Sequence, residues 1–521
     1  MRLMPSENIR PIEMPNPFGE VSCENEIALF KERYSEFYFY AAPFNEEFLK
    51  ASRYLIIGRR GAGKTSLARF LSFQTAIRNA RCIYVDEPEL YAEVLHKLAD
   101  QPDQPNEIVI PRIRKIWEYL IWTLLFHEYG QSDPRIPHLP RDLGSTARPT
   151  NLLRSAVERL VSSFLRSDDG RLASNLEDYL TSEPLDRLKK ATLSLTREAP
   201  ALLALDSLEH YSIDNTAMMR SVAALISAAS GLAAAHSNDG IYVKVFLSGE
   251  VFPYLWENLV ENPGKHVKSP LWLHWRPKDL IRLVCWRFFQ YLSKDGQPEL
   301  SKLDIDWDKF SSVNGAMWTP YFGSTIVNRI GVTEESFAYV LRHTQMRPRQ
   351  IVYLCNQIAL RAREARTFPS FSSEIIRDAL HGSQSELAVE VLNAYTGTYP
   401  GVAGIVNALV GLPRLFKGSE LDRVAPRTAS EWQHEKYSPL RFRELVAELG
   451  IVGRVRRHDQ RTGFVEADFE YSLPNRLALQ VDDLCAIHPM FFQRLHIGNS
   501  VNAIVYPFPD HPEFSGVRPG S

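Results

Sequence analysis

The feature that most constrains this chain is a glycine-rich segment that directly follows a short apolar run. The apolar run is Tyr54-Leu55-Ile56-Ile57, and the next residues read Gly58-Arg59-Arg60-Gly61-Ala62-Gly63-Lys64-Thr65-Ser66. A continuous apolar run of this length is typical of a strand buried on both faces of a parallel sheet. The glycine-rich segment fits G-x-x-x-x-G-K-[ST], in which glycines let successive backbone N–H groups turn toward one anion. The sequence therefore predicts a strand, a phosphate-binding loop and a helix, in that order.

The positions of this loop have distinct expected parts in holding a nucleotide. A helix that starts near Lys64 would point its positive N-terminal end at the phosphates. Lys64 would reach the β- and γ-phosphates, and the Thr65 hydroxyl would ligate Mg²⁺. Arg59 and Arg60 add positive charge, although both side chains could equally be solvated or salt-bridged. No [NT]-K-x-D element that would read guanine is present, so the expected cofactors are ATP and Mg²⁺.

A magnesium ion in such a site also needs a carboxylate at the end of a neighbouring strand. The apolar run 201–205 ends at Asp206, which is the favoured metal ligand, and Glu209 follows as the candidate general base that polarises water. A rival acidic pair, Asp86-Glu87, follows the run 82–85. That run comes only about 20 residues after the loop, where the second strand of such a fold normally falls, so we favour Asp206.

Two further polar positions could sense the bound nucleotide. Ser248 follows the apolar run 241–247, where a strand-end side chain can contact a γ-phosphate, although a plain strand-end turn fits equally. Arg349, and after it Arg347, stand at the start of a predicted lid helix and could reach the nucleotide. The alternative for both arginines is helix capping and surface charge.

The alternation of short apolar runs with helical segments predicts a three-layer α/β fold with a parallel sheet, as in a P-loop NTPase core. The predicted strands are 54–57, 82–85, 201–205, 241–247 and 271–275. The expected domains are an N-terminal extension at 1–50, a core at 51–295 with a helical insert at 88–200, a helical lid at 296–390, a helical linker at 391–434, a winged-helix domain at 435–500 and a tail at 501–521. We expect helix 24–40 in the extension to pack on the domain that follows it.

The C-terminal module carries the pattern of a winged helix. Phe442, Leu445, Val446 and Leu449 are spaced as on one face of a helix, and a strand, turn and alternating strand follow. Arginines of this hairpin could touch DNA phosphates. They are Arg454, Arg456, Arg457 and Arg461. Residues 414–518 hold fourteen Lys/Arg and fourteen Asp/Glu, and such a neutral module is at least as often a protein-contact module as a DNA-binding one.

Composition restricts the remaining classes. The formal net charge of −2 excludes a strongly basic coat for nucleic acid, and five scattered cysteines favour a reducing, cytoplasmic location. The N-terminus has early charges and no apolar stretch of a signal peptide. Residues 221–238 and 392–413 lack charge, but we interpret both as buried helices and expect no membrane contact.

Several segments together resemble a known family. GRRGAGKTSL, LLALDSLEHY, FLSGE and MRPRQIVYLCN, with LVAELGIVG, FEYS and IHPMF in the C-terminal module, resemble prokaryotic P-loop ATPases of the AAA+/STAND/KAP-like grouping that end in a winged helix. The resemblance covers about residues 40–497. It implies ATP-dependent conformational switching, often with homo-oligomerisation or an effector on another chain, and often in anti-phage defence.

The resemblance has two departures that concern hydrolysis rather than binding. The strand-end pair is Asp206-Ser207 where such ATPases often have Asp-Glu, and no trans-acting arginine is identified, Arg276 being the candidate. We therefore expect a slow ATPase that needs a partner. The rival functions are an origin-recognition-like protein with ATP-gated DNA binding and a non-hydrolysing ATP-bound scaffold.

Overall fold

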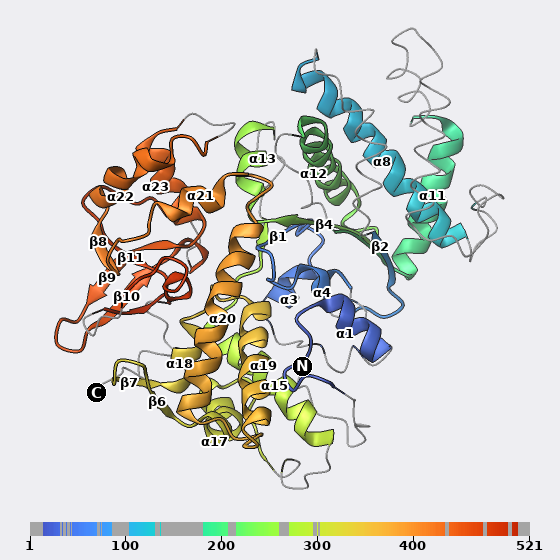
Figure 1. Cartoon of the computed structure of the whole chain (residues 1–521). Helices are drawn as coiled ribbons and strands as arrows, with labels where there is room; N and C mark the ends of the chain where they lie inside the picture. The colour runs from blue at the N-terminus through green and yellow to red at the C-terminus, as the bar shows by residue number, and fades with distance from the viewer. Residues whose placement is uncertain are drawn as a thin grey trace. The chain divides into compact units, whose positions relative to one another are not determined.

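The chain forms two compact units in the computed structural model (Figure 1). The sheet unit is Pro43–Leu273, and the helical unit combines Met1–Ala42 with His274–Ser521. The structure describes residues 14–31, 34, 38, 42, 44–69, 73, 76–85, 104–130, 136, 181–206, 215–259, 270–294, 300, 303–432, 437–472, 477–498 and 503–508.

The sheet unit is built on a five-stranded parallel sheet in the order β2-β3-β4-β1-β5. Its strands are β1 (Leu55–Gly58), β2 (Arg81–Val85), β3 (Ala201–Leu205), β4 (Ile241–Ser248) and β5 (Leu271–Trp272). All of the runs predicted as strands are confirmed, although β5 is shorter than expected. The later strand β4 lies between β1 and β3, so the order of strands in the sheet differs from their order in the chain.

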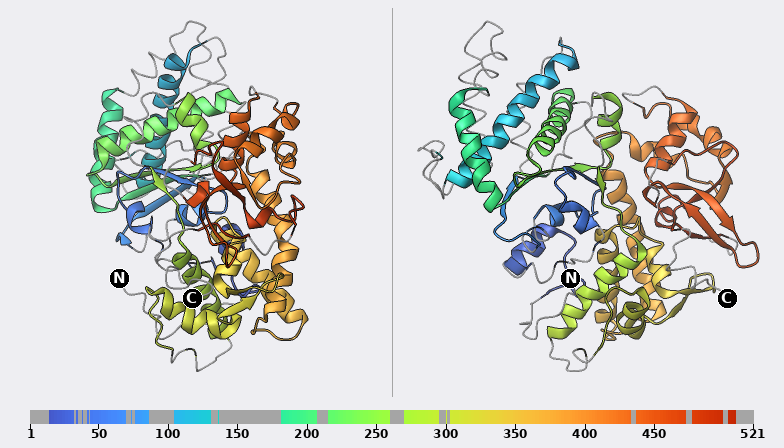
Figure 2. Two further views of the ribbon diagram at one scale, coloured as in Figure 1. Left: turned by 90° about the vertical axis from the view of Figure 1, so that its left-hand side faces the viewer. Right: turned by 180° about the vertical axis from the view of Figure 1, so that it is seen from behind.

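Helices cover both faces of this sheet and complete the three layers (Figures 1 and 2). On one face lie α8 (Asn106–Gly130), α11 (Glu183–Glu198) and α12 (Thr216–His236), and on the other lie α3 (Phe44–Phe48) and α4 (Lys64–Ala68). Successive side chains of β4 point to opposite faces of the sheet, which explains why each face packs against its own set of helices. Val243 and Val245 join the apolar core with α8 and α12, whereas Phe246 meets Phe48 of α3 at 6.2 Å between ring centroids.

The first described helix of the insert is longer than its apolar spacing indicates. Apolar residues at helical spacing predict a helix over 113–129, whereas α8 starts at Asn106 and includes Pro111 in its second turn. Of the predicted helix over 172–195, residues from 183 onward form α11. The predicted helix 152–165 lies outside the described residues, as does the predicted loop 131–151 apart from Ile136.

The uncharged stretch 221–238 is a buried helix, as predicted. It belongs to α12, where the Trp117 indole of α8 donates to the Ser221 carbonyl oxygen at 3.0 Å. Within the described part of the chain, α12 alone is long and apolar enough to cross a membrane, and 78% of its apolar window is buried inside the protein. The other stretch, 392–413, is not one helix but the end of α20 (Ser373–Asn393), turns and the short α21 (Val402–Asn407).

The helical unit begins with long helices that pack around an aromatic core. Its elements up to residue 393 are α15 (Pro277–Lys294), α16 (Phe310–Val313), α17 (Thr319–Phe322), β6 (Thr325–Val327), β7 (Thr333–Glu335), α18 (Ser336–Leu341), α19 (Pro348–Glu364) and α20. The N-terminal helix α1 (Cys23–Phe30) belongs here rather than to the sheet unit that follows it, because Glu26 pairs with Arg287 of α15 at 2.8 Å.

The C-terminal module of the helical unit has the predicted helix and hairpin within a larger sheet. Its elements are β8 (Leu415–Lys417), α22 (Ser419–Val424), α23 (Pro439–Glu448), β9 (Val452–His458), β10 (Phe464–Asp468), β11 (Leu484–Ile487) and β12 (Ile504–Tyr506). The sheet runs β12-β10-β9-β11-β8, and β10 pairs with β9 in antiparallel fashion. The apolar residues around Pro489 in the segment 488–492 predict a helix start, and the segment forms a single 3₁₀ turn, Pro489–Phe491.

One expectation about the end of the chain is wrong, and another remains a prediction. Residues 504–506 were expected in a tail but form β12, which pairs in parallel with β10. The winged-helix assignment stays a prediction, as do the separate lid, linker and winged-helix domains. The lid helices and the module share one hydrophobic core, and the amide of Gln345 donates to the Leu449 carbonyl oxygen at 2.9 Å.

Candidate functional site

The glycine-rich loop joins the buried strand β1 to helix α4, as its sequence predicted. Gly61 has φ 82° and Gly63 has φ 94°, a region of backbone space that favours glycine, and α4 begins at Lys64 directly after them. The amide of Ala62 donates to the Arg59 carbonyl oxygen at 2.9 Å and closes the turn. The loop therefore curls back over the end of β1 at the N-terminal end of a helix, which is the arrangement that an anion requires.

Lys64 lies in the fold of this loop. Its side chain is buried, and its ammonium donates to the carbonyl oxygen of Gly58 at 2.9 Å. A Cβ atom at Gly58 would come within 3.1 Å of the Lys64 Cγ atom, so a larger residue there would push the lysine stem aside. The ammonium thus rests on a neutral acceptor of the loop itself, which a phosphate oxygen can replace with a stronger, charged one.

A buried carboxylate supports the loop from the neighbouring strand. Glu250, after the end of β4, accepts a hydrogen bond from the backbone amide of Arg60 at 3.0 Å. The Ser248 hydroxyl donates to the other carboxylate oxygen of Glu250. The sensor candidate Ser248 is therefore already engaged by Glu250, and its oxygen also accepts from the Glu250 amide at 3.2 Å.

Asp206 follows β3 and lies on the same face of the sheet as α4. Ala201, Leu203 and Leu205 of β3 join the core on the α8 and α12 side, so residue 206 continues the opposite set. A contact with the neighbouring strand confirms this side. The Asp206 carboxylate accepts from the Tyr84 hydroxyl of β2 at 3.1 Å.

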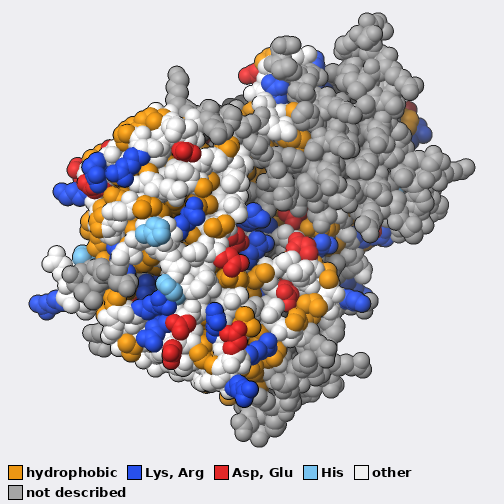
Figure 3. Space-filling model, viewed as in Figure 1, with side chains coloured by type: hydrophobic (Ala, Val, Ile, Leu, Met, Phe, Trp, Pro, Cys, Tyr) orange, Lys and Arg blue, Asp and Glu red, His pale blue; other side chains and the backbone are white. Residues whose placement is uncertain are grey.

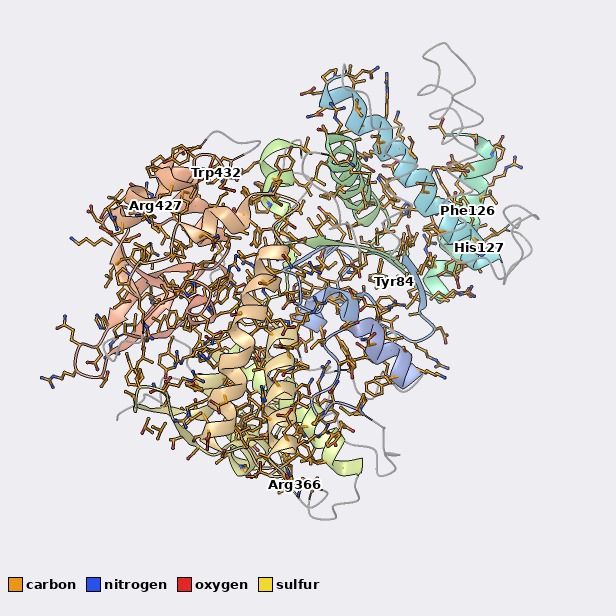
Figure 4. The ribbon with its side chains drawn as sticks, in the orientation of Figure 1. Tyr84, Phe126, His127, Arg366, Arg427 and Trp432 are labelled. Atoms are coloured by element: carbon orange, nitrogen blue, oxygen red, sulfur yellow. The ribbon has the colours of Figure 1, made fainter. Side chains whose placement is uncertain are left out.

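Tyr84 also links Asp206 to the helix after the loop. The guanidinium of Arg69, at the C-terminal end of α4, lies 4.1 Å from the centre of the Tyr84 ring. Figure 4 shows Tyr84 beside the sheet at β2. Asp206 is only 2% exposed, so the Tyr84 hydroxyl fixes a carboxylate that is largely removed from water.

The two candidate magnesium ligands, Thr65 and Asp206, both offer oxygen atoms, which Mg²⁺ prefers as ligands. The Thr65 hydroxyl stands on the first turn of α4, and Asp206 contributes one carboxylate at the same edge of the sheet. The described residues contain no group of three or more His, Cys, Asp or Glu side chains that could hold a metal ion. A hydroxyl and one carboxylate fit Mg²⁺ bound mainly through water and substrate phosphates.

Other predicted residues fall elsewhere. Glu209 and the rival pair Asp86-Glu87 lie outside the described residues. Arg347 and Arg349 belong to the helical unit, where each has a local partner. Arg347 is buried and donates to the Gln345 side chain at 2.6 Å, and Arg349 lies 3.4 Å from a carboxylate oxygen of Glu390.

The loop arginines differ from one another. Arg60 is exposed, whereas Arg59 is half-buried and its stem runs beside Gly249, where a Cβ atom would lie 3.3 Å from the Arg59 Cγ atom. Ser66, on the first turn of α4, is half-buried.

Sequence reasoning missed Glu250 and Tyr84 as parts of this site. A signal was present for Glu250, because an acidic residue directly after the strand that carries Ser248 can accept from a neighbouring loop. No signal identified Tyr84, because it lies 122 positions from Asp206 in the chain and its hydroxyl meets Asp206 only through the pairing of β2 with β3.

The strand order, the loop at the end of β1 and the acidic residue after β3 together give the sheet unit the architecture of a P-loop NTPase core. No family model and no curated protein matches the chain. A solved structure of the Aeropyrum pernix ORC2 protein, described as ADPNP-ADP complexes, aligns over 94% of both chains at 14% identity and a TM-score of 0.33. This likeness is too low to carry an inference about function.

Proposed function

We propose that this chain binds Mg-ATP at residues 58–66 and Asp206 and hydrolyses it slowly. One observation supports this most directly. Asp206 projects on the α4 face of the sheet and is tied through Tyr84 to the helix that carries Lys64 and Thr65. A phosphate chain that enters the loop would therefore have the lysine, the hydroxyl and the carboxylate at one edge of the sheet.

The roles of the chain's own groups follow from this arrangement. The ammonium of Lys64 leaves the Gly58 carbonyl oxygen and pairs with the β- and γ-phosphates. Backbone N–H groups of the loop other than those of Arg60 and Ala62, which already donate within the chain, would hold the phosphate oxygens. Thr65 and Asp206 would hold Mg²⁺, which when bound neutralises phosphate charge. Glu209 is the proposed base that orients the attacking water.

Nucleotide state would be passed to the helical unit by an arginine. Arg349, or Arg347 as second choice, takes this role in the proposal, and it would have to give up its contact with Glu390 or Gln345. Hydrolysis is expected to be slow in the isolated chain, because transition-state charge is often completed by an arginine from a partner. The controlled output would be homo-oligomerisation or an effector on another chain.

The test measures ATP affinity and phosphate release in matched variants of the whole chain. Lys64→Ala should weaken ATP binding by about 100-fold, because the charged contact to the phosphates is lost. Asp206→Asn should keep most of the binding but lower phosphate release by about 100-fold. Lys190→Ala, an exposed lysine of α11, is the control of equal charge change. Unchanged ATP affinity in Lys64→Ala would reject the proposal.

The second candidate function, ATP-gated DNA binding, is favoured by the hairpin of β9 and β10. Arg456 and Arg457 are exposed on β9, and their neighbours Arg454 and Arg461 belong to the same hairpin. Arg456 lies 3.7 Å from an Asp468 carboxylate oxygen, and this carboxylate partly balances the positive charge of Arg456.

Duplex binding would distinguish this function from the first. Arg456→Ala/Arg457→Ala should make the slope of log affinity against log salt concentration shallower, by the amount that about two phosphate contacts contribute. The matched control is Arg423→Ala/Arg427→Ala, with Arg427 near the end of α22 (Figure 4). Two results together would favour the scaffold alternative. Lys64→Ala would abolish assembly of the protein, and Glu209→Gln would leave every activity unchanged.

A further inference from the structure

A cavity within the helical unit is walled by side chains from its helices and from its C-terminal module. Its volume is about 150 Å³, which corresponds to roughly five water molecules at about 30 Å³ each. Residues of α18 and α20 form one wall, and Arg414, Phe492 and Ile504 of the module form the other. The space suits a phosphate group with a small substituent.

Positive charge dominates the wall of this cavity. The lining contains four arginines and no aspartate or glutamate. Its two histidines, His343 and His381, add little charge, because burial lowers the pKa of each. The arginines are Arg329, Arg342, Arg377 and Arg414. On the face shown in Figure 3, Lys, Arg and His side chains lie beside Asp and Glu side chains in the region of α18 and α20, so the outer surface there is mixed in charge. The wall of the cavity itself, in contrast, is suited to an anion.

Nearby carboxylates balance only part of this charge. Arg342 pairs with the buried Glu334 at 3.0 Å, and Arg329 pairs with Asp378 at 3.2 Å. Asp378 is 62% exposed, so water weakens the second pair. Arg377 donates to the Val327 carbonyl oxygen at 3.1 Å and makes no ion pair with any residue that the structure describes.

Arg414 is held in place from the module side. Its guanidinium donates to the carbonyl oxygens of Gly498 at 3.0 Å and Ala503 at 3.1 Å, and lies 4.5 Å from the centre of the Phe492 ring. Burial, and then the charge of Arg342, lowers the pKa of Arg414 to about 10. The Glu334 carboxylate opposes this lowering of the pKa but does not cancel it, so a further anion beside Arg414 would reduce the remaining repulsion.

A neutral donor in the same wall lacks a partner. Gln384 lines the cavity from α20 and is 8% exposed, yet its amide makes no hydrogen bond to any described residue. The polar atoms of this amide are open to the cavity rather than sealed inside the fold. The amide of Gln384 is therefore placed to bind a ligand that also meets the arginines.

We propose that this cavity binds a small phosphate-bearing anion, with Arg377, Arg414 and Gln384 as its main contacts. Guanidinium groups match phosphate oxygens in paired hydrogen bonds, and an amide N–H can serve a further oxygen. Because the contacts come from both α20 and the module, the bound anion would fasten these parts of the helical unit together. This site is separate from the loop at residues 58–66 and does not depend on ATP binding there.

The test titrates the full-length chain, without ATP, with inorganic phosphate and with pyrophosphate in a calorimeter. A Lys64→Ala background removes the contribution of the nucleotide loop. Binding should persist in that background and should weaken by at least about 10-fold with Arg377→Gln, which loses one charged contact. Gln384→Leu should weaken it by about 5-fold, because it removes the amide at similar volume. Arg361→Gln, a 56%-exposed arginine of α19 outside the cavity lining, is the control and should bind normally.

Three results would overturn the proposal. They are loss of all binding in Lys64→Ala, equal affinity in Arg377→Gln and Arg361→Gln, and binding of a DNA duplex without binding of either small anion. Thermal unfolding of each variant checks that it is folded. If Arg377→Gln does not fold, Gln384→Leu decides alone, and unchanged affinity in that variant rejects the site.

Discussion

At the scale of single residues, Glu250 links the glycine-rich loop at residues 58–66 to the end of β4. It is 2% exposed and accepts both the Arg60 amide and the Ser248 hydroxyl. The Arg60 amide is thereby turned toward Glu250. A γ-phosphate sensor at Ser248 would have to exchange this partner for a phosphate oxygen, so Glu250 sets how readily Ser248 can respond.

The first residue-scale prediction concerns Glu250→Ala. The change leaves the Arg60 amide and the Ser248 hydroxyl without their acceptor, which should lower the free energy of unfolding by about 1–3 kcal/mol. ATP affinity should fall by about 10-fold because the loop loses its support. Urea unfolding and nucleotide titration measure the two effects.

Ser248→Ala is the matched control for that prediction. It removes the hydroxyl but keeps the contact between Arg60 and Glu250, so it should lower stability less than Glu250→Ala. If Glu250→Ala binds ATP as tightly as the natural chain, the carboxylate has no part in shaping the loop.

At the scale of secondary-structure elements, Lys244 fastens the segment after α3 to the sheet. It is fully buried on β4, and its ammonium donates to the carbonyl oxygens of Lys50 at 2.8 Å and Arg53 at 2.9 Å. The ammonium lies 5.0 Å from the centre of the Phe48 ring. Burial, and then the charge of Arg53, lowers the pKa of Lys244 from 10.5 to about 7.

This pKa shift predicts a pH-dependent stability. Between pH of about 7 and 10.5, the unfolded chain holds a proton on Lys244 that the folded chain has released, so this group's contribution to the free energy of unfolding rises with pH. Below about pH 7 both states are protonated and the contribution is constant. The slope should reach up to about 1.4 kcal/mol per pH unit.

Lys244→Met tests this by removing the titrating group. Urea unfolding between about pH 6.5 and 9.5 should show the natural chain gaining stability relative to the variant as the pH rises. Lys190→Met, at an exposed position, should follow the natural chain across the same range. Parallel curves for the natural chain and Lys244→Met would mean that Lys244 keeps an ordinary pKa when folded.

At the scale of the whole molecule, β12 is joined to the helical part of its unit through a buried ion pair. Glu334 of β7 pairs with Arg342 at 3.0 Å, and the same carboxylate oxygen accepts from the Tyr506 hydroxyl of β12 at 2.6 Å. All three side chains are buried. The segment expected to be a tail is thus part of the core that holds the helices and the module together.

Removing one partner of this buried ion pair should strongly lower the stability of the fold. Glu334→Ala leaves the Arg342 charge buried without its carboxylate and should lower the free energy of unfolding by about 3–5 kcal/mol. Tyr506→Phe removes only one hydrogen bond and should cost about 1 kcal/mol. Denaturant unfolding gives both values, and a loss for Glu334→Ala no larger than that for Tyr506→Phe would contradict the buried-pair account.

The parts of the fold that could be predicted are those with a local signal. The runs 54–57 and 201–205 are continuous and apolar because their strands are buried on both faces, and the glycines of the loop are required by positive φ at Gly61 and Gly63. The assignment of α1 to the helical unit could not be predicted, since it depends on the contact between Glu26 and Arg287, far apart in the chain.

By itself, the amino-acid sequence determined that a glycine-rich turn follows a buried strand and that a parallel α/β unit surrounds it, because periodicity and glycine chemistry act over a few neighbouring residues. Only the tertiary structure decided that Tyr84 holds Asp206, that Glu250 holds the loop, and that Arg377, Arg414 and Gln384 meet around one cavity. Those contacts join side chains from distant segments. They follow from strand pairing and core packing, which no short stretch of residues specifies.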